Sequence, residues 1–345
     1  MTQLTTSDRH RFEERCPVPL PAPARSLLNF VKPSRWQDES DEAIAEHITR
    51  IRDRVHAIDP WPCLSRFAFL SPRIRKGLSH GIYEDTLANF QQALSVSSTS
   101  GAASPLFLDF ATGLGQEARA LVQDGIPAPS IVGADLLPEF IQAGLELFGD
   151  GDGSTPNPNG ADDKPTTFKT LPNLPTSELT WTTCNIFQPS DVLALRAVAA
   201  AQGGHGFHTI FLGSFLHCFN LERQRLAVRA IATHLLSAQP GATIVGRHTA
   251  IPAGVAPGAT EAPPGLRREE FQSTFRHDEE SFRRELWDWE IAQRTEAERQ
   301  SGGGWDVVVH VSTPEETDSA LKSDHRSGGL NRTMCFKVTR TAEVV

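Results

Sequence analysis

The sequence predicts an α/β protein with a seven-stranded, Rossmann-like sheet whose last strand is antiparallel, preceded by a helical N-terminal extension. Two observations support this fold class. Between residues 105 and 250, short apolar runs alternate with helical patterns, which is typical of βαβ units and a parallel sheet. The last two apolar runs, 305–312 and 334–340, are joined by about twenty residues without a helical pattern, so the final strand should run antiparallel to its neighbour.

Each expected strand is a short apolar run that ends in turn residues. The seven runs cover residues 106–110, 130–135, 179–187, 207–215, 242–248, 305–312 and 334–340. A helical pattern follows each of the first four runs, and one more helix is expected within 268–295. Residues 249–266 are rich in Ala, Pro and Gly, so we expect a loop there.

The N-terminal third has a different character from the rest of the chain. Residues 1–36 are rich in Pro and Arg and are expected to form a disordered or extended arm. Apolar residues recur at helical spacing from Asp38 to Ile58, and a second helix is expected over Tyr83–Leu94, followed by a Ser-rich linker at 95–104. Residues 37–104 should therefore form a helical extension and lid.

The remaining chain, 105–345, is expected to be a single Rossmann-like domain. Its low-complexity stretch at 150–168, rich in Gly, Asp and Pro, predicts a loop insertion that extends over 150–178.

Composition excludes several classes of protein. The formal net charge of −9 argues against a nucleic-acid binder, and no apolar run reaches the roughly 20 residues of a membrane span. The N-terminus lacks the apolar core of a signal peptide. The five cysteines are dispersed without a CxxC pair or Cys/His cluster, so we expect no metal site and reduced thiols in a cytoplasmic protein. A homodimer is left open, with the helix over 38–58 as the surface that a second copy would meet.

A turn of small residues joins the first strand to the following helix and is the main candidate for a ligand site. Asp109 closes the strand, and Ala111, Gly113, Gly115 and Gln116 follow it. Small residues let the backbone approach a ligand closely, and the helix N-terminus supplies N–H groups. A tight structural turn would carry the same residues.

The second strand ends in an acid, Asp135. At roughly 20 residues past a Gly-rich turn, an acid accepts hydrogen bonds from ribose hydroxyls, and Leu136 beside it is assigned to the same site. Asp135 could instead cap the helix that begins at Pro138. NAD-binding proteins share this feature, and Ala118 is compatible with their fingerprint, so the choice of cofactor depends on the C-terminal strand order.

Three further strand ends supply candidate residues, because parallel sheets bind ligands at the carboxyl ends of their strands. Asn185 could bind an adenine amine and Ile186 could pack on the ring, or Asn185 could simply start a turn. Ser214 is assigned to the cofactor site. His217 is a candidate base or hydrogen-bond donor toward an acceptor oxygen, or a residue that ties down its loop. Arg247 could hold a substrate carboxylate, or be a surface arginine.

The run FLDFATGLGQEARALVQDGIPAPSIVGADLLPEFIQAGLELF resembles the cofactor core of fungal secondary-metabolite methyltransferases of the austinol-pathway type. Three other segments are similar in kind: WPCLSRFAFLSPRI near residue 61, IFLGSFLHCFNLERQ at 210–224 and PGATIVGRHTA at 240–250. The expected antiparallel last strand is also a feature of the seven-stranded sheet of class I methyltransferases.

The resemblance implies S-adenosyl-L-methionine as cofactor and O-methylation of a small-molecule carboxylate or hydroxyl. It places the candidate residues of the first three strand ends at the cofactor, and His217 and Arg247 at the substrate. Two positions depart from the pattern: Ala111 stands where such enzymes have Gly, and Asn185 where they have an acid. A cyclase or pericyclic catalyst, or a non-catalytic binding protein on the same fold, are the alternatives.

Overall fold

The computed structural model describes most of the chain. The described residues are 15–101, 103–151, 166–252, 254–255, 257–261, 273–296, 298, 303–313, 316 and 331–342. They divide into two compact units, which are described separately below. Unit 1 comprises 15–73 and 111–183, and unit 2 comprises 74–110, 184–261 and the described residues from 273 onward.

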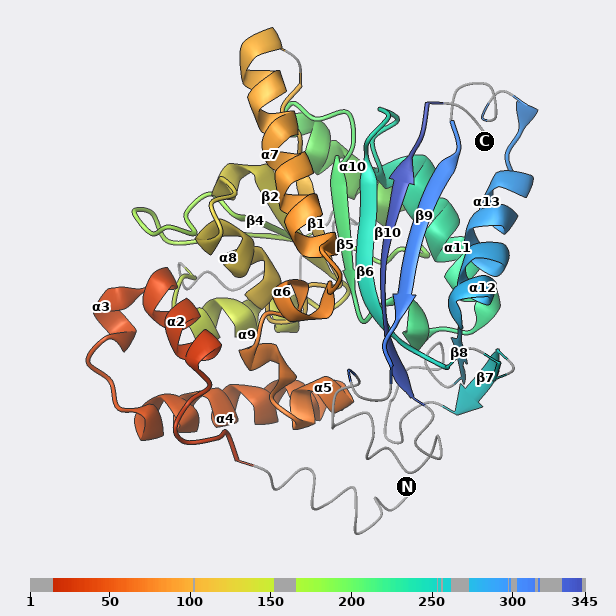
Figure 1. Ribbon diagram of the computed structural model, residues 1–345. Helices are drawn as coiled ribbons and strands as arrows, with labels where there is room; N and C mark the ends of the chain where they lie inside the picture. Colours follow the sequence, from red (N-terminus) through yellow and green to blue (C-terminus); the bar gives the residue numbers. More distant parts are fainter. Residues whose placement is uncertain are drawn as a thin grey trace. The chain divides into compact units, whose positions relative to one another are not determined.

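Eight of the described strands form one mixed sheet, in the order β3-β4-β2-β1-β5-β6-β10-β9. Their bounds are β1 Phe107–Phe110, β2 Ile131–Asp135, β3 Thr167–Phe168, β4 Thr180–Thr183, β5 Thr209–Gly213, β6 Thr243–Ala250, β9 Trp305–Val311 and β10 Arg332–Arg340. All seven expected strands are present. The last strand, β10, lies between β6 and β9 and is antiparallel to both (Figure 1). This order confirms the predicted fold class, and β3 adds a short antiparallel edge strand beside β4.

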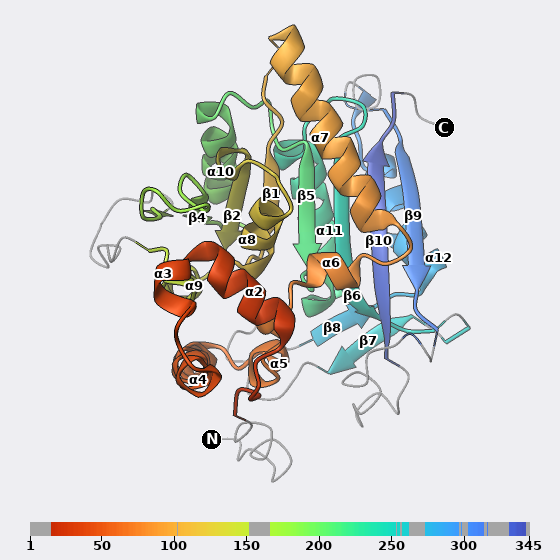
Figure 2. The ribbon, with the colours of Figure 1, turned by 60° about the vertical axis from the view of Figure 1, so that its left-hand side comes forward.

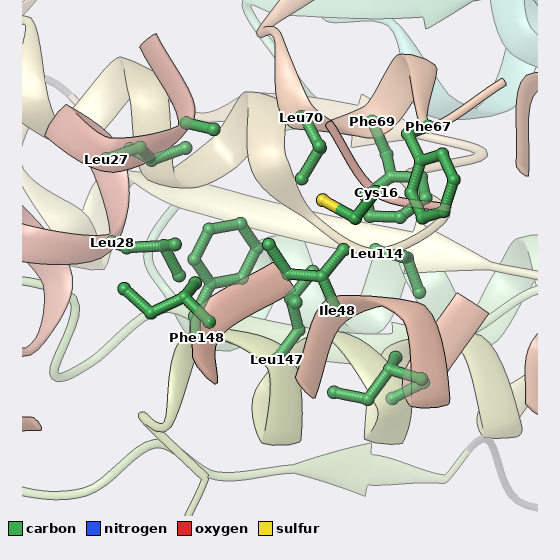
Figure 3. Close-up of a cluster of buried hydrophobic side chains, with 14 of the residues drawn as sticks. Cys16, Leu27, Leu28, Ile48, Phe67, Phe69, Leu70, Leu114, Leu147 and Phe148 are labelled. Atoms are coloured by element: carbon green, nitrogen blue, oxygen red, sulfur yellow. The ribbon is translucent and has the colours of Figure 1, made fainter. Parts of the chain in front are cut away.

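Unit 1 packs the N-terminal helices against the two helices that flank β2. Its helices are α2 Ala22–Val31, α3 Pro33–Trp36, α4 Asp41–Ile58, α5 Pro62–Ser65, η1 Ala68–Leu70, α8 Gln116–Gln123, η2 Ala128–Ser130 and α9 Pro138–Phe148. Figure 3 shows their shared apolar cluster, in which Leu28 and Ile48 from the N-terminal helices meet Leu147 and Phe148 of α9.

The disordered or extended arm expected over 1–36 is helical in its second half. Residues 22–36 form α2 and α3, and the apolar side of α2, with Leu27, Leu28 and Val31, is buried. Two of the prolines that suggested an irregular arm, Pro23 and Pro33, lie in the first turns of these helices, where a missing N–H costs nothing. Residues 1–14 lie outside the described range.

Helix α4 confirms the expected helix over 38–58. Ser40 caps it by accepting a hydrogen bond from Ala43 N at 3.2 Å. Its apolar stripe, which includes Ile44, Ile48 and Ile51, is fully buried inside unit 1. The apolar face that could have met a second copy is therefore used within the chain.

Unit 2 holds five strands of the eight-stranded sheet and most of the later helices. The helices are α7 Ile82–Ser100, α10 Pro189–Ala201, η3 Leu216–Cys218, α11 Leu221–Ala230, η4 Ile231–Leu235, α12 Glu279–Phe282, η6 Arg283–Asp288 and α13 Trp289–Ala292, and α6 Arg73–Gly77 lies at the boundary between the units. Helix α7 runs along one face of these strands (Figure 2), where Phe90 meets the ring of Phe107 edge-on at 5.6 Å.

Two sequence expectations in unit 2 are wrong. The Ser-rich linker at 95–104 is helical as far as Ser100, although its hydroxyls bond main-chain carbonyls of the preceding turn, a contact that does not favour a helix; Ser100 Oγ donates to Val96 O at 2.8 Å. The loop at 249–266 contains β7, Gly258–Glu261, which pairs with β8, Ser273–Arg276. Pairing with a distant strand overrides a composition that favours loops.

The boundary expected near residue 105 also differs from the contact pattern, since α7 belongs to unit 2 and residues 111–183 belong to unit 1. About half of the insertion expected over 150–178, namely residues 152–165, lies outside the described residues. Of the rest, 167–168 form β3. No helix among the described residues is both long and apolar enough to cross a bilayer.

Candidate functional site

The turn between β1 and α8 has three left-handed residues within five positions. Ala111, Gly113 and Gly115 have φ of +57°, +58° and +74°. A Cβ added at Gly113 would meet nothing within 4 Å, so this side of the turn is open. A Cβ at Gly115 would lie 2.5 Å from the Trp181 ring, so Gly115 is required by internal packing. The open backbone at Gly113 is the part of the turn that fits the close approach of a ligand.

The inner side of the turn is held by a buried arginine. Arg119 on α8 donates from Nη1 to the carbonyl oxygens of Leu114 at 3.1 Å and Gly115 at 2.9 Å. Its Nε and Nη2 bind Asp150 at 2.8 and 2.7 Å, and Thr176 Oγ1 donates to the same carboxylate at 2.9 Å. Both charged side chains are 1% exposed or less. The guanidinium therefore joins the turn to the segment after α9.

Sequence reasoning missed this network. Arg119 fits the helical pattern of α8 as an ordinary polar residue, and Asp150 opens the low-complexity stretch. Neither position gives a signal before the fold brings them together.

Helix α9 contacts the same turn through a glycine. A Cβ at Gly144 would lie 2.2 Å from the Leu114 carbonyl oxygen, so only glycine allows this approach. On the strand below, a Cβ at Gly133 would lie 2.4 Å from Trp181. The turn is thus fixed from within unit 1 by backbone contacts and by one indole ring.

Asp135, at the end of β2, ties the turn to the start of α9. Its Oδ2 accepts from Gly113 N at 2.8 Å and its Oδ1 accepts from Leu137 N at 3.0 Å. Part of its predicted capping role is therefore real, although the N-cap position belongs to Leu137. A carboxylate has about four acceptor positions, so it can accept several hydrogen bonds at once. Leu136 is partly buried against the apolar cluster of unit 1.

Gln116 begins α8, and its side-chain amide donates to Glu117 Oε1 at 3.1 Å. Glu117 Oε1 also accepts from the backbone N–H of Arg73 at 2.8 Å. Gln116 thus belongs to a polar cluster at the helix N-terminus.

In unit 2, the predicted residues at the ends of β1 and β4 are mostly buried. Asp109 is 1% exposed and lies opposite Phe211 of β5 in the sheet. The side-chain oxygen of Asn185 accepts from Phe187 N at 3.1 Å, so Asn185 shapes the turn before α10, as its alternative role predicted. Ile186 is buried.

A backbone hydrogen bond joins Ser214, directly after β5, to Arg247 within β6. Ser214 has a left-handed φ of +59° and its N–H donates to Arg247 O at 2.7 Å. Arg247 Nη2 donates to Thr333 Oγ1 of β10 at 3.3 Å. His217, in η3, accepts at Nδ1 from Thr249 N at 3.4 Å.

The two candidate catalytic residues are not brought together. Successive residues of a strand face opposite sides of a sheet, so Arg247 and His248 of β6 point in opposite directions. The His217 ring meets His248 edge-on at 5.9 Å, which places His217 on the His248 side. The Arg247 side chain reaches Thr333 on the other side.

A small cavity opens beside His217, with room for about one water molecule. It is lined by Leu216, His217, Gln224, His248, Thr249, Phe275, His277, Phe282 and Met334. Burial holds the pKa of His248 well below its usual range and lowers the pKa of His277 to about 4, so both rings are neutral at pH 7. Neither ring nitrogen of His248 has a hydrogen-bond partner among the described residues.

Comparison with known proteins points to one family of enzymes. Residues 35–70, which include α4, match the family model of the meroterpenoid methyltransferase N-terminal domain. The methyltransferase trt5 of Aspergillus terreus (strain NIH 2624 / FGSC A1156) is 27% identical over 82% of this chain and 78% of its own length. The asnovolin E/chermesin D methyltransferase nvfJ of Aspergillus novofumigatus (strain IBT 16806) is 25% identical over 92% of this chain and 88% of its own.

A solved S-adenosylmethionine-dependent methyltransferase from Clostridium acetobutylicum ATCC 824 aligns with 81% of this chain and all of its own, at 10% identity and a TM-score of 0.38. The fungal relatives confirm the expected kinship with secondary-metabolite methyltransferases. The relatives are themselves named as methyltransferases, in agreement with the predicted enzyme class.

Proposed function

We propose that this protein is an O-methyltransferase that acts on a carboxylate or hydroxyl of a small secondary metabolite, and that a carboxylate fits it better. The observation that carries the proposal is the open left-handed turn at Gly113, bound to Asp135, in a chain related to fungal methyltransferases. S-adenosylmethionine, when bound, supplies an electrophilic sulfonium methyl group.

Several side chains would hold the cofactor. In unit 1, the open side of the turn at Gly113 and the carboxylate of Asp135 suit the nucleoside and its ribose hydroxyls. In unit 2, Asp109 and Ser214 at the strand ends and Ile186 beside them are the candidates for the amino-acid and adenine portions. The side-chain oxygen of Asn185 is used within its own turn, where it accepts a hydrogen bond from Phe187 N.

The hydrogen bond at His217 supports a carboxylate acceptor. Because Nδ1 accepts a hydrogen bond from Thr249 N, the neutral imidazole of His217 carries its proton on Nε2. A donor can orient a substrate carboxylate, which is already ionised and needs no base, whereas an alcohol would need a proton acceptor. Arg247 faces the other side of β6, so we assign the acceptor group to His217.

The first test is calorimetric titration of S-adenosylmethionine into wild-type protein and two variants. Asp135→Asn keeps the shape of the side chain but removes the charge, and should weaken binding about ten-fold or more, the equivalent of one strong hydrogen bond. Glu139→Gln removes a charge from an exposed residue on the first turn of α9 and serves as the matched control. Absence of binding by wild-type protein would refute the proposal.

The second test identifies the acceptor. Purified protein is incubated with S-adenosylmethionine and paired carboxylic acids and alcohols of terpenoid and polyketide type, and products are analysed by mass spectrometry. A carboxylate acceptor yields a methyl ester that mild base hydrolyses, whereas a hydroxyl acceptor yields a base-stable ether. His217→Gln keeps a side-chain donor and should retain more activity than His217→Ala; equal loss in both would assign His217 the role of base. A rearranged product with the cofactor unconsumed would instead indicate a cyclase.

A further inference from the structure

Three metal-ligating side chains meet in unit 2, away from the residues assigned to methyl transfer. His80 precedes α7, His310 lies on β9, and Glu316 follows that strand. One ligand atom from each residue lies within 4.8 Å of the other two. His80 Nε2 is 3.9 Å from Glu316 Oε1, and His310 Nε2 is 3.5 Å from Glu316 Oε2.

These separations are close to those around a bound transition-metal ion. Imidazole and carboxylate ligands bind Zn²⁺ at about 2.0–2.2 Å, which puts neighbouring ligand atoms of a tetrahedral site about 3.3–3.6 Å apart. The His310–Glu316 distance of 3.5 Å falls in this range, and the His80–Glu316 distance of 3.9 Å lies just beyond it. The two imidazole rings are in contact, with centroids 3.4 Å apart, so His80 would have to turn away from His310 for both rings to bind one ion.

A second observation concerns the middle ligand. His310 Nε2 is shielded from solvent, and its partner Glu316 Oε2, at 3.5 Å, is too far for a well-formed hydrogen bond. A shielded polar atom of this kind is unfavourable unless something binds it. A metal ion between His310 and Glu316 would satisfy this nitrogen.

The backbone around the cluster keeps the ligands in place. Glu316 Oε2 accepts from Thr313 N at 2.8 Å, which fixes the carboxylate. His80 has a left-handed φ of +60°, which non-glycine residues adopt rarely, although histidine does so more often than most. The preceding residue, Ser79, is held by a contact of 3.3 Å between its Oγ and the Sγ of Cys335. Cys335 is on β10, directly opposite His310 of β9.

We propose that His80, His310 and Glu316 form a binding site for a divalent transition metal, with Zn²⁺ the best match to two imidazoles and one carboxylate. The ion joins the segment before α7 to the end of β9, and a water molecule completes its coordination. This site is not apparent from the sequence, because its ligands come from three segments without a short ligand spacing.

The test is titration of ZnCl₂ into tag-free full-length protein, followed by calorimetry and by thermal unfolding. One Zn²⁺ should bind per chain and raise the unfolding temperature, since a ligand that binds the folded state stabilises it. His80→Ala and Glu316→Gln should each weaken binding at least about ten-fold. His205→Ala, which removes an exposed histidine elsewhere in unit 2, should bind as wild type.

Mg²⁺ serves as the second control, because it prefers oxygen ligands and should not compete. Failure of the wild-type protein to bind Zn²⁺ would overturn the proposal. So would unchanged binding in His80→Ala and Glu316→Gln, because the ion would then occupy another site.

Discussion

Removal of the buried charge at Arg119 should separate two roles of that side chain: stability of unit 1 and the shape of the cofactor turn. In Arg119→Met, the carboxylate of Asp150 stays fully buried and keeps only the hydrogen bond from Thr176 among its side-chain partners described above. An uncompensated buried charge of this kind costs about 3–5 kcal/mol. We therefore expect a large decrease in the free energy of unfolding.

The double variant Arg119→Met/Asp150→Leu removes both charges. Apolar replacements of a buried ion pair are often neutral or better, so most of the stability should return. Met can still pack against Phe148 and Trp181, whose ring centroids lie 4.4 and 4.7 Å from the guanidinium carbon. The lost acceptor of Thr176 should leave a deficit of about 1–3 kcal/mol.

The recovered stability should not restore cofactor binding. Leu114 and Gly115 lose the two hydrogen bonds from Arg119, each with a net value of about 0.5–1.5 kcal/mol. If these bonds hold the turn in its binding shape, affinity for S-adenosylmethionine should fall about ten-fold or more. Urea unfolding measures the first effect and calorimetry the second. A double variant that is stable and binds the cofactor like wild type would show that Arg119 has only a structural role.

Three further predictions follow from the same units. Ala111→Gly should raise the urea midpoint slightly, because it relieves a left-handed strain of about 1–2 kcal/mol against an entropy cost of about 0.5–1 kcal/mol; a lower midpoint would contradict this. Gly144→Ala would gain about 1 kcal/mol of helix propensity, but its Cβ would lie 2.2 Å from Leu114 O. We therefore expect the free energy of unfolding to fall by about 1–3 kcal/mol, and cofactor binding to weaken. A stabilised variant would refute the packing argument. The pKa of His277 is about 4 when folded and near 6.5 when unfolded, so the unfolded state binds the extra proton between these values and stability should fall as pH drops from 6.5 to 4. This histidine adds at most about 1.4 kcal/mol per pH unit to the slope of the free energy of unfolding against pH. His277→Gln should therefore make the urea midpoint less dependent on pH over that range. An unchanged slope would show that His277 is not buried in the neutral form.

The sequence predicted the strands well because each buried strand is a short apolar run with turn residues at its ends. The runs at 106–110 and 334–340 are recognised in the same way, although β1 runs parallel to its neighbour β5 and β10 runs antiparallel to its neighbour β6. The N-terminal helices were harder. Pro23 and Pro33 look like breakers in the sequence, yet they lie in first helical turns, and only the burial of Leu27 and Leu28 shows why the helix forms.

The candidate site was predictable only in part. Residue type and position at a strand end indicated Asp135, and the structure gives it a definite partner in Gly113. Arg119 could not be identified, because its significance depends on Asp150, 31 residues later and in a stretch with no periodicity. A buried ion pair leaves no local pattern, since each partner is an ordinary polar residue until the chain folds.

Strand alternation is a signal that the sequence does contain, and it changes the interpretation of the substrate side. Position along β6 places Arg247 and His248 at the same strand end, but the period of two puts their side chains on opposite faces. His217 contacts the His248 face, where His248 and His277 are held neutral by burial. An anionic acceptor there would rely on the Nε2–H donor of His217 rather than on a guanidinium. A carboxylate held by one neutral donor remains a good nucleophile, because its charge is not neutralised by a bidentate ion pair.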